Sequence, residues 1–277
     1  LLPLDLDIET KAVLKKAAAA RAALAEVKGI ATTIPNETIL INTLSLQEAK
    51  DSSEIENIVT TNDDLFQSDA GTLDFRSPAA KEVYSYAKAL QDGFHIVKEK
   101  GFLSLNHIKA IQGTIVESNA GFRKLPGTVL KNDKTGEVIY TPPQHPDDIE
   151  KLMTNFEAFF NGAAPSDWDP LVKMAVLHHQ FESIHPFYDG NGRTGRILNL
   201  LYLVKEGLLD TPVLYLSRYI NHHKAEYYRL LQKVHEENAW EPWVLFMLEA
   251  VEQTSLHTSK IISGIKALML HHKQRIR

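Results

Sequence analysis

Apolar and polar residues follow each other along most of this chain with the spacing of an amphipathic α-helix. The stretch from Glu9 to Lys28 is rich in alanine, the strongest helix former, and ends at Gly29. Further on, a capping side chain stands directly before a proline at Ser77-Pro78 and at Asp169-Pro170, which is typical of a helix start. The pattern therefore predicts a mainly α-helical protein. The expected helices cover residues 9–28, 35–42, 45–56, 78–91, 105–118, 146–161, 169–184, 192–207, 222–234 and 240–273.

The boundaries of some expected helices depend on short local signals. Ser45-Leu46-Gln47-Glu48 has the spacing of a capping box, so a new helix is expected to begin there and to run towards Glu56. Asn57 is a residue type that tolerates the left-handed conformation in which many helices end. The polar stretch from Thr60 to Asp69 is expected to be a connection, and Asp147 is expected to cap the helix that follows it.

The clearest departure from helical spacing lies between Gly121 and Thr141. Two runs of β-forming residues, 128–131 and 137–141, flank the turn-forming sequence from Asn132 to Gly136. This arrangement predicts a β-hairpin. The residues alone leave open whether the hairpin takes part in function or only decorates the surface.

The composition is that of an ordinary globular protein. Of the 277 residues, 44% are hydrophobic and 23% are charged, which is enough for a sizeable core in one large domain or two small ones. The formal net charge is −5 and the pI is about 6.2, so there is no broad basic surface for nucleic acid. Because the chain has no cysteine, disulfides, thiolate metal sites and a cysteine nucleophile are excluded.

The sequence also bears on where the protein is found. No apolar run approaches the ~20 residues of a membrane span, so no membrane segment is expected. The stretch from Leu1 to Thr10 has three acidic residues and no basic one, unlike a secretory signal. The absence of cysteine suits a reducing compartment. These features favour a cytoplasmic protein.

The stretch that carries the most chemistry runs from His185 to Arg196 and has the sequence HPFYDGNGRTGR. His185 is its one side chain suited to proton transfer near neutral pH, and Asp189 is a hard oxygen ligand of the kind that Mg²⁺ prefers. The sequence Gly190-Asn191-Gly192 precedes an apolar helical run, so its N–H groups lie at a helix N-terminus, where anions bind. Arg193 and Arg196 lie on the first turns of that helix. The stretch predicts a site for a polyphosphate and its Mg²⁺ beside a base.

Other interpretations of this stretch fit less well. Gly190, Gly192 and Gly195 match the dinucleotide fingerprint G-x-G-x-x-G, but that motif follows a strand, whereas residues 169–184 predict a helix. A Walker A loop ends in Gly-Lys-Ser/Thr, which Gly195-Arg196-Ile197 does not supply. A plain polar loop would not normally gather one histidine, one aspartate, three glycines and two arginines within so few residues.

The stretch resembles the signature of the Fic family, H-x-F-x-D/E-G-N-G-R-x-x-R, at every specified position. The resemblance implies a Fic-fold helical bundle with a β-hairpin flap at the active site, and transfer of AMP from ATP to a hydroxyl side chain (Ser, Thr or Tyr) of a protein. It implies that His185 is the base, that Asp189 holds Mg²⁺ and that Arg196 reaches the γ-phosphate. The other motif residues of the implied nucleotide site are Gly190, Asn191, Gly192, Arg193, Thr194 and Gly195.

A second stretch, from Ser52 to Asn57, is similar to the inhibitory motif S/T-x-x-x-E-G/N of the same family. From the residues alone, Glu56 is more simply a solvated glutamate at a helix end, where a carboxylate opposes the helix dipole. The resemblance instead implies that Ser52, Glu56 and Asn57 belong to an inhibitory helix, as in the class of Fic proteins that carries this helix before the catalytic motif. Glu56 would then pair with Arg196 and misplace ATP.

The resemblance also assigns roles to the predicted hairpin. The flap, residues 121–141, would hold the target protein by strand addition, with Val138, Ile139 and Tyr140 beside the nucleotide. Tyr228 belongs to a Tyr-Tyr pair that the resemblance places at the adenine pocket, although ordinary packing is the simpler interpretation of two tyrosines.

The expected organisation has three parts: an N-terminal helical region over 1–110 with the inhibitory helix near 46–57, a Fic core over 111–250, and a C-terminal helix over 251–277. The expected ligands and partners are ATP, Mg²⁺ and an unknown target protein, while self-modification and a homodimer are left open. The alternatives are removal of AMP from a modified protein, transfer of another nucleotide, and a nucleotide-sensing regulator without catalysis.

Overall fold

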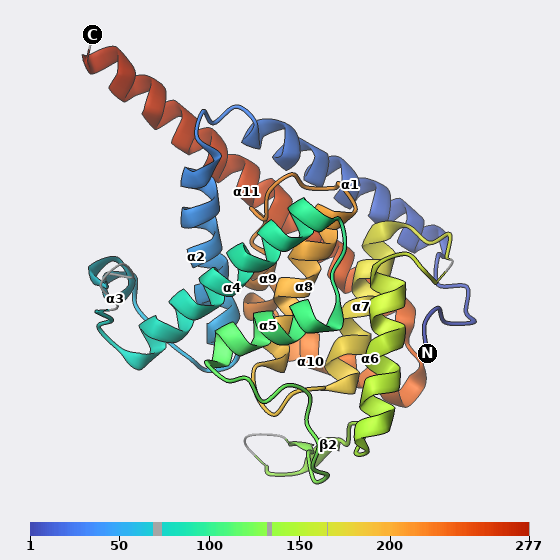
Figure 1. Cartoon of the computed structure of the whole chain (residues 1–277). Helices are drawn as coiled ribbons and strands as arrows, with labels where there is room; N and C mark the ends of the chain where they lie inside the picture. The colour runs from blue at the N-terminus through green and yellow to red at the C-terminus, as the bar shows by residue number, and fades with distance from the viewer. Residues whose placement is uncertain (69–73, 132–134, 165, 277) are drawn as a thin grey trace.

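Helices dominate the computed structural model, which describes residues 1–68, 74–131, 135–164 and 166–276 (Figure 1). This confirms the mainly α-helical fold with a small β-hairpin that the sequence pattern predicts. The helices are α1 (Lys11–Ala31), α2 (Glu37–Ile55), α3 (Asn62–Gln67), α4 (Pro78–Lys100), α5 (Leu105–Val116), α6 (Pro146–Phe160), α7 (Pro170–Ile184), α8 (Asn191–Lys205), α9 (Leu216–His222), α10 (Lys224–Glu237) and α11 (Trp240–Ile276), and the strands are β1 (Leu130–Lys131) and β2 (Val138–Tyr140).

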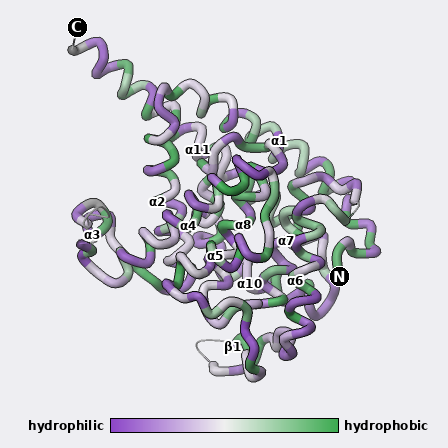
Figure 2. The backbone as a smooth tube through the Cα atoms, in the orientation of Figure 1, coloured by the Kyte–Doolittle hydropathy of each residue, from purple (hydrophilic) through white to green (hydrophobic). Residues whose placement is uncertain are grey.

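The centre of the molecule is formed by α7 and α8. The two helices pack against each other, and α8 also packs against α4 and α5. Buried residues lie all round both helices rather than on one stripe, as expected for helices enclosed by neighbours. Trp243 of α11 is fully buried and its indole N–H donates to the carbonyl of Ala175 at 2.8 Å. Outer helices such as α6 instead alternate polar and apolar residues (Figure 2).

The first and last helices form the most extensive helix pair. α1 and α11 lie side by side (Figure 1), and Lys16 of α1 forms ion pairs with Glu249 and Glu252 of α11. The C-terminal part of α11 extends beyond the body of the molecule. Among the residues that the structure describes, no helix is long and apolar enough to cross a membrane.

The expected helix start at Ser45 is wrong, because α2 runs without interruption from Glu37 to Ile55. Ser45 and Glu48 are buried in the middle of this helix instead of capping it. The Glu48 carboxylate accepts hydrogen bonds from the backbone N–H of Ser217, at 3.0 Å, and from its hydroxyl. The Glu48 side chain, which the local pattern assigned to a helix cap, therefore binds a residue 169 positions away in the sequence.

Two smaller expectations also need correction. The stretch expected to be a connection contains α3, which Thr61 caps by accepting from the N–H of Asp64 at 3.0 Å. Asp147 does not cap α6, because that helix already begins at Pro146.

The predicted hairpin is formed by β1 and β2, which pair antiparallel with Leu130 opposite Tyr140 and Lys131 opposite Val138. Part of its expected turn, residues 132–134, lies outside the described residues. Gln144 joins the two ends of the hairpin, since its side chain accepts from the N–H of Gly127 at 2.7 Å and donates to the carbonyl of Thr128 at 2.9 Å. The hairpin is thus closed at its base.

We predict that Glu48→Gln changes how stability depends on pH. Burial raises the pKa of Glu48 to about 7, although its bonds to Ser217 lower it. Because this folded-state pKa lies above the ordinary 4.5, the contribution of Glu48 to stability is complete below pH 4.5 and is lost as the pH rises through about 7. Glutamine has no charge to bury, so the variant should gain on the order of 3 kcal/mol relative to the wild type between pH 4.5 and pH 8.

Urea unfolding at several pH values measures this difference. Glu54→Gln, on the same helix but less buried, serves as the control. Parallel stability curves for Glu48→Gln and the wild type would contradict the prediction.

Candidate active site

The expected catalytic stretch is the turn between α7 and α8. His185 ends α7 in the left-handed conformation, with φ 48°, and Gly190 precedes α8 with φ 77°. The side chain of Asn191 shapes the turn between them, because it accepts from the N–H of Phe187 and donates to the carbonyl of Phe187, both at 2.8 Å. Phe187 itself is fully buried. The turn is therefore fixed from inside, and it holds the histidine at the end of one central helix and beside the N-terminus of the other.

Three glycines in and after this turn each face a different neighbour. A methyl group on Gly190 would lie 2.8 Å from Val116, and one on Gly195 would lie 2.7 Å from Oε1 of Glu182. A methyl group on Gly192 would collide with the carboxylate of Glu56. The last contact is informative, because a carboxylate already lies against the first turn of α8, where an anion is expected.

His185 is held as a neutral base. Burial of the ring, together with the nearby charge of Arg123, lowers the pKa of His185 to about 4. A neutral imidazole can accept a proton, so at pH 7 nearly all of the protein carries His185 in the form required of a general base.

Asp189 is the residue expected to hold Mg²⁺, and its side chain is 75% exposed. Its Oδ1 accepts from the N–H of Gly190 at 2.6 Å and lies 3.4 Å from Nη2 of Arg193. The described residues contain no group of three or more acidic, histidine or cysteine side chains that could hold a metal. A single exposed carboxylate fits Mg²⁺ that arrives with the phosphates of a nucleotide and keeps several waters, rather than Mg²⁺ in a cage of protein ligands.

Arg193 is almost fully buried, with 4% of its side chain exposed. Its Nη1 lies 2.7 Å from Oε2 of Glu82 on α4, a contact between residues 111 positions apart. Glu82 could not be singled out from the sequence, because one glutamate on a helix is ordinary until its partner is known.

Arg196 is fixed by the end of α2. Its Nε donates to the hydroxyl of Ser52 at 2.7 Å, and its Nη2 donates to the carbonyl of Ser52 at 2.9 Å and to Oε1 of Glu56 at 2.8 Å. The guanidinium is 1% exposed, whereas the Glu56 side chain is 35% exposed. The structure thus contains the ion pair expected between these residues, and it brings Ser52 and Glu56 together on one arginine.

The charge state of this pair follows from its surroundings. Burial alone would raise the pKa of the Glu56 carboxyl, but the charge and hydrogen bond of Arg196 hold that pKa below its ordinary value. Asn57, directly after the C-cap Glu56, takes the left-handed conformation with φ 63° that its residue type tolerates, and its side chain accepts from Nζ of Lys224 at 3.1 Å. At neutral pH the pair is therefore fully ionised.

The remaining predicted site residues lie at the rim. Val138, Ile139 and Tyr228 are exposed. The hydroxyl of Tyr140 donates to the carbonyl of Ser183 at 3.1 Å, which joins the hairpin to the end of α7. In the motif helix, Thr194 is fully buried and its hydroxyl has no hydrogen-bond partner among the described residues.

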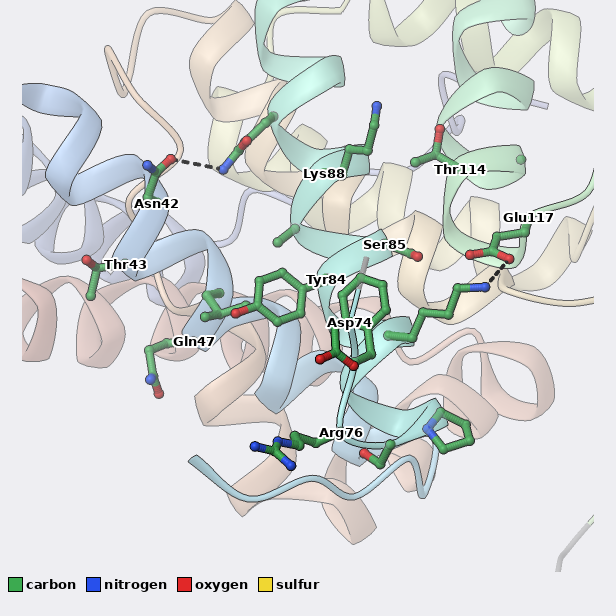
Figure 3. A pocket seen from close by; sticks show the side chains of 18 residues that line it. Asn42, Thr43, Gln47, Asp74, Arg76, Tyr84, Ser85, Lys88, Thr114 and Glu117 are labelled. Carbon is green, nitrogen blue, oxygen red and sulfur yellow. Dashed lines mark hydrogen bonds and ion pairs between the residues drawn. The ribbon is translucent and has the colours of Figure 1, made fainter. Parts of the chain in front are cut away.

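A large groove in the described structure lies away from the motif. It has a volume of about 1490 Å³ and is lined by residues of α2, α4 and α5 and by residues 74–77 (Figure 3). Its walls are joined by a bond from Gln91 to Asn42, at 3.3 Å, and by an ion pair between Lys81 and Glu117, at 2.6 Å. None of the residues from 185 to 196 lines it. The groove is therefore not the site built by the motif.

Comparison with known proteins agrees with this geometry. The family profile described as Fic/DOC family N-terminal matches residues 14–95, and the profile described as Fic/DOC family matches residues 102–203. The curated proteins named protein adenylyltransferase Fic from Aedes aegypti and from Drosophila ananassae are each 34% identical to this chain over 112 residues. That match covers 40% of this chain and 21% of the relative, so it spans about a fifth of the length of these proteins.

Solved structures show the same fold. A Fic family protein from Desulfovibrio desulfuricans G20 superposes with a TM-score of 0.75 at 21% identity and covers 94% of this chain and 76% of its own. A Fic domain containing signaling protein from Bacteroides thetaiotaomicron gives 0.70 at 18% identity, with 89% and 97% covered. The helical bundle of this chain is therefore a Fic fold. This chain belongs to the Fic family.

We predict that the His185 imidazole titrates with a pKa of about 4, because burial and the charge of Arg123 both disfavour its protonated form. ¹H–¹³C NMR during a pH titration measures this value, and His185→Asn identifies the resonance. A midpoint near 6.5 would contradict the prediction.

Proposed function

We propose that this chain is a protein adenylyltransferase that moves AMP from ATP to a hydroxyl side chain of a protein. The observation that carries the proposal is the convergence of a neutral His185, the N-terminus of α8 and two buried arginines, Arg193 and Arg196. The names of the matched relatives agree with this activity.

In the proposed reaction, the residues of the site have separate roles in proton transfer, phosphate binding and metal binding. His185 takes the proton of the target hydroxyl, whose oxygen forms a bond to the α-phosphorus of ATP. The bond from that phosphorus to the bridging oxygen breaks, and pyrophosphate leaves. The N–H groups at the start of α8 and the guanidinium of Arg193 stabilise the phosphate charge. Mg²⁺, when bound, supplies further charge neutralisation and would be held by Asp189.

In the same proposal, the end of α2 inhibits the enzyme. The Glu56 carboxylate lies against Gly192 and binds Arg196, so it takes up both the anion site and the arginine that would bind the γ-phosphate. A carboxylate and a phosphate cannot share this position without strong repulsion between like charges. Ser52 strengthens the arrangement, because it accepts a hydrogen bond from the same arginine.

The hairpin would present the target. Exposed residues Val138 and Ile139 on β2 suit a partner chain that adds as a strand and so brings a hydroxyl towards His185. The carbonyl of Ile139 already accepts from the side chain of Gln232 at 3.1 Å. We therefore expect an added strand to displace that amide. The exposed ring of Tyr228 is kept as the proposed wall for adenine.

We predict that Glu56→Gly raises the rate of AMP transfer by roughly tenfold or more, since a hydrogen bond to a charged group is worth about 1.5–3 kcal/mol. Wild type and variant are incubated with Mg²⁺ and ATP labelled at the α-phosphate, and label on protein is followed. Glu54→Gly is the matched control, because it makes the same change two residues before Glu56 at a side chain that forms no ion pair with Arg196. Equal rates for wild type and Glu56→Gly would overturn the inhibitory role.

We further predict that His185→Ala, placed in the Glu56→Gly protein, lowers the transfer rate by roughly 10²–10⁴-fold, because a positioned general base contributes that much. The same labelling assay measures it, with ATP binding recorded by calorimetry. Absence of label in every protein, with ATP bound, would exclude AMP transfer and leave another nucleotide donor or a regulatory role.

A further inference from the structure

A third buried arginine, Arg123, lies beside the turn that carries His185 and is 1% exposed. Its Nε donates to the carbonyl of His185 at 2.7 Å, and its Nη2 donates to the carbonyl of Ile184 at 3.3 Å. Its backbone N–H donates to the carbonyl of Pro186 at 2.8 Å. One residue therefore binds three consecutive carbonyls of the turn that holds the base.

The same guanidinium also holds the hairpin. Arg123 lies on the segment that enters the hairpin, and its Nη2 binds the carbonyl of Pro143, directly after the hairpin. The entry of the hairpin, its exit and the catalytic turn thus meet at one side chain. Among the basic side chains, arginine has several N–H donors fixed in one plane, whereas the lysine ammonium is a compact point charge at a single nitrogen.

The charge of Arg123 is unusual for a buried group. Among the residues that the structure describes, no carboxylate forms an ion pair with it, and its Nη1 has no hydrogen-bond partner. Burial lowers the pKa of this guanidinium, and the groups that oppose the effect are the hydroxyls of Tyr188 and Tyr140. Burying a charge without a counter-ion is unfavourable, so stability alone does not account for an arginine here.

We propose that Arg123 is a positioning residue for the reaction: it fixes the left-handed backbone at His185 and both ends of the hairpin in one arrangement, so that the base and the docked hydroxyl meet. The inference rests on the proposed function and deepens it. It follows because the base lies on the turn and the target lies on the hairpin, and Arg123 is the described side chain that binds the backbone of both. A misplacement of about 1 Å between reacting groups can cost about 10²-fold in rate.

Arg123→Met and Arg123→Lys test this, both in the Glu56→Gly protein. The control is Arg21→Met, which removes an arginine whose Nε lies 2.6 Å from Asp169, away from the motif. We expect Arg123→Met to lower the rate at saturating ATP by roughly 10²-fold while the ATP concentration for half-maximal rate changes less than about threefold. Arg123→Lys keeps the positive charge but not the planar set of donors, so its rate at saturating ATP should fall less than that of Arg123→Met. A loss no larger than that of Arg21→Met would overturn the proposal.

Hydrogen exchange provides a readout that does not need catalysis. Amides at 184, 185 and 187 and at both ends of the hairpin should exchange faster in Arg123→Met than in Arg21→Met, whereas the amides of α11 should not differ. If the Glu56→Gly parent transfers no AMP, the proposed function fails, and hydrogen exchange alone tests the positioning role of Arg123. Selective loss of protection at the turn and hairpin would then support the positioning role, and uniform or unchanged protection would overturn it.

Discussion

The arrangement of this molecule depends on a guanidinium that is kept away from water. Arg196 lies inside the protein on the first turns of α8, and a buried charge requires acceptors on every side. The end of α2 supplies them through Ser52 and Glu56. The phosphates of a nucleotide would satisfy the same requirement. Under the proposed function, Glu56 and the nucleotide would be two alternative counter-ions for one buried arginine.

Three buried arginines lie at the turn that carries His185, and each has a different kind of hydrogen-bond partner. Arg196 binds a carboxylate from α2, Arg193 binds Glu82 of α4, and Arg123 binds backbone carbonyls only. The first two can exchange a carboxylate for a phosphate, because both partners are anions. The bonds of Arg123 instead hold chain segments together. This division separates the groups suited to binding the nucleotide from the group suited to holding the base.

The parts of the site that the sequence reveals are those that are contiguous. Residues 185–196 contain a base, a carboxylate, glycines and arginines in one run, so their chemistry could be inferred before any folding was known. Local signals also located most helices, since caps, prolines and glycines act on their own neighbours. They failed at Ser45 and Glu48, where a distant partner on α9 outweighed the local pattern. Glu82 and Arg123 could not be found from the sequence, because their partners lie 111 and about 60 positions away.

Glu56, the glutamate proposed to inhibit the enzyme, lies at the end of its helix, and this position determines how much of the helix must move to release it. Glu48 anchors the middle of α2 in the core, whereas Glu56 is the residue that ends the helix, held there by an N–H bond to Ser53 at 3.0 Å. Helix ends fray at little free-energy cost, while a buried helix does not leave its core readily. Unwinding of the last turn alone would remove Glu56 from Arg196 and leave the two hydrogen bonds to Ser52 in place. The resting activity of the protein would then be set by the local opening equilibrium of a single helical turn, and a partner that contacts only that turn could adjust it.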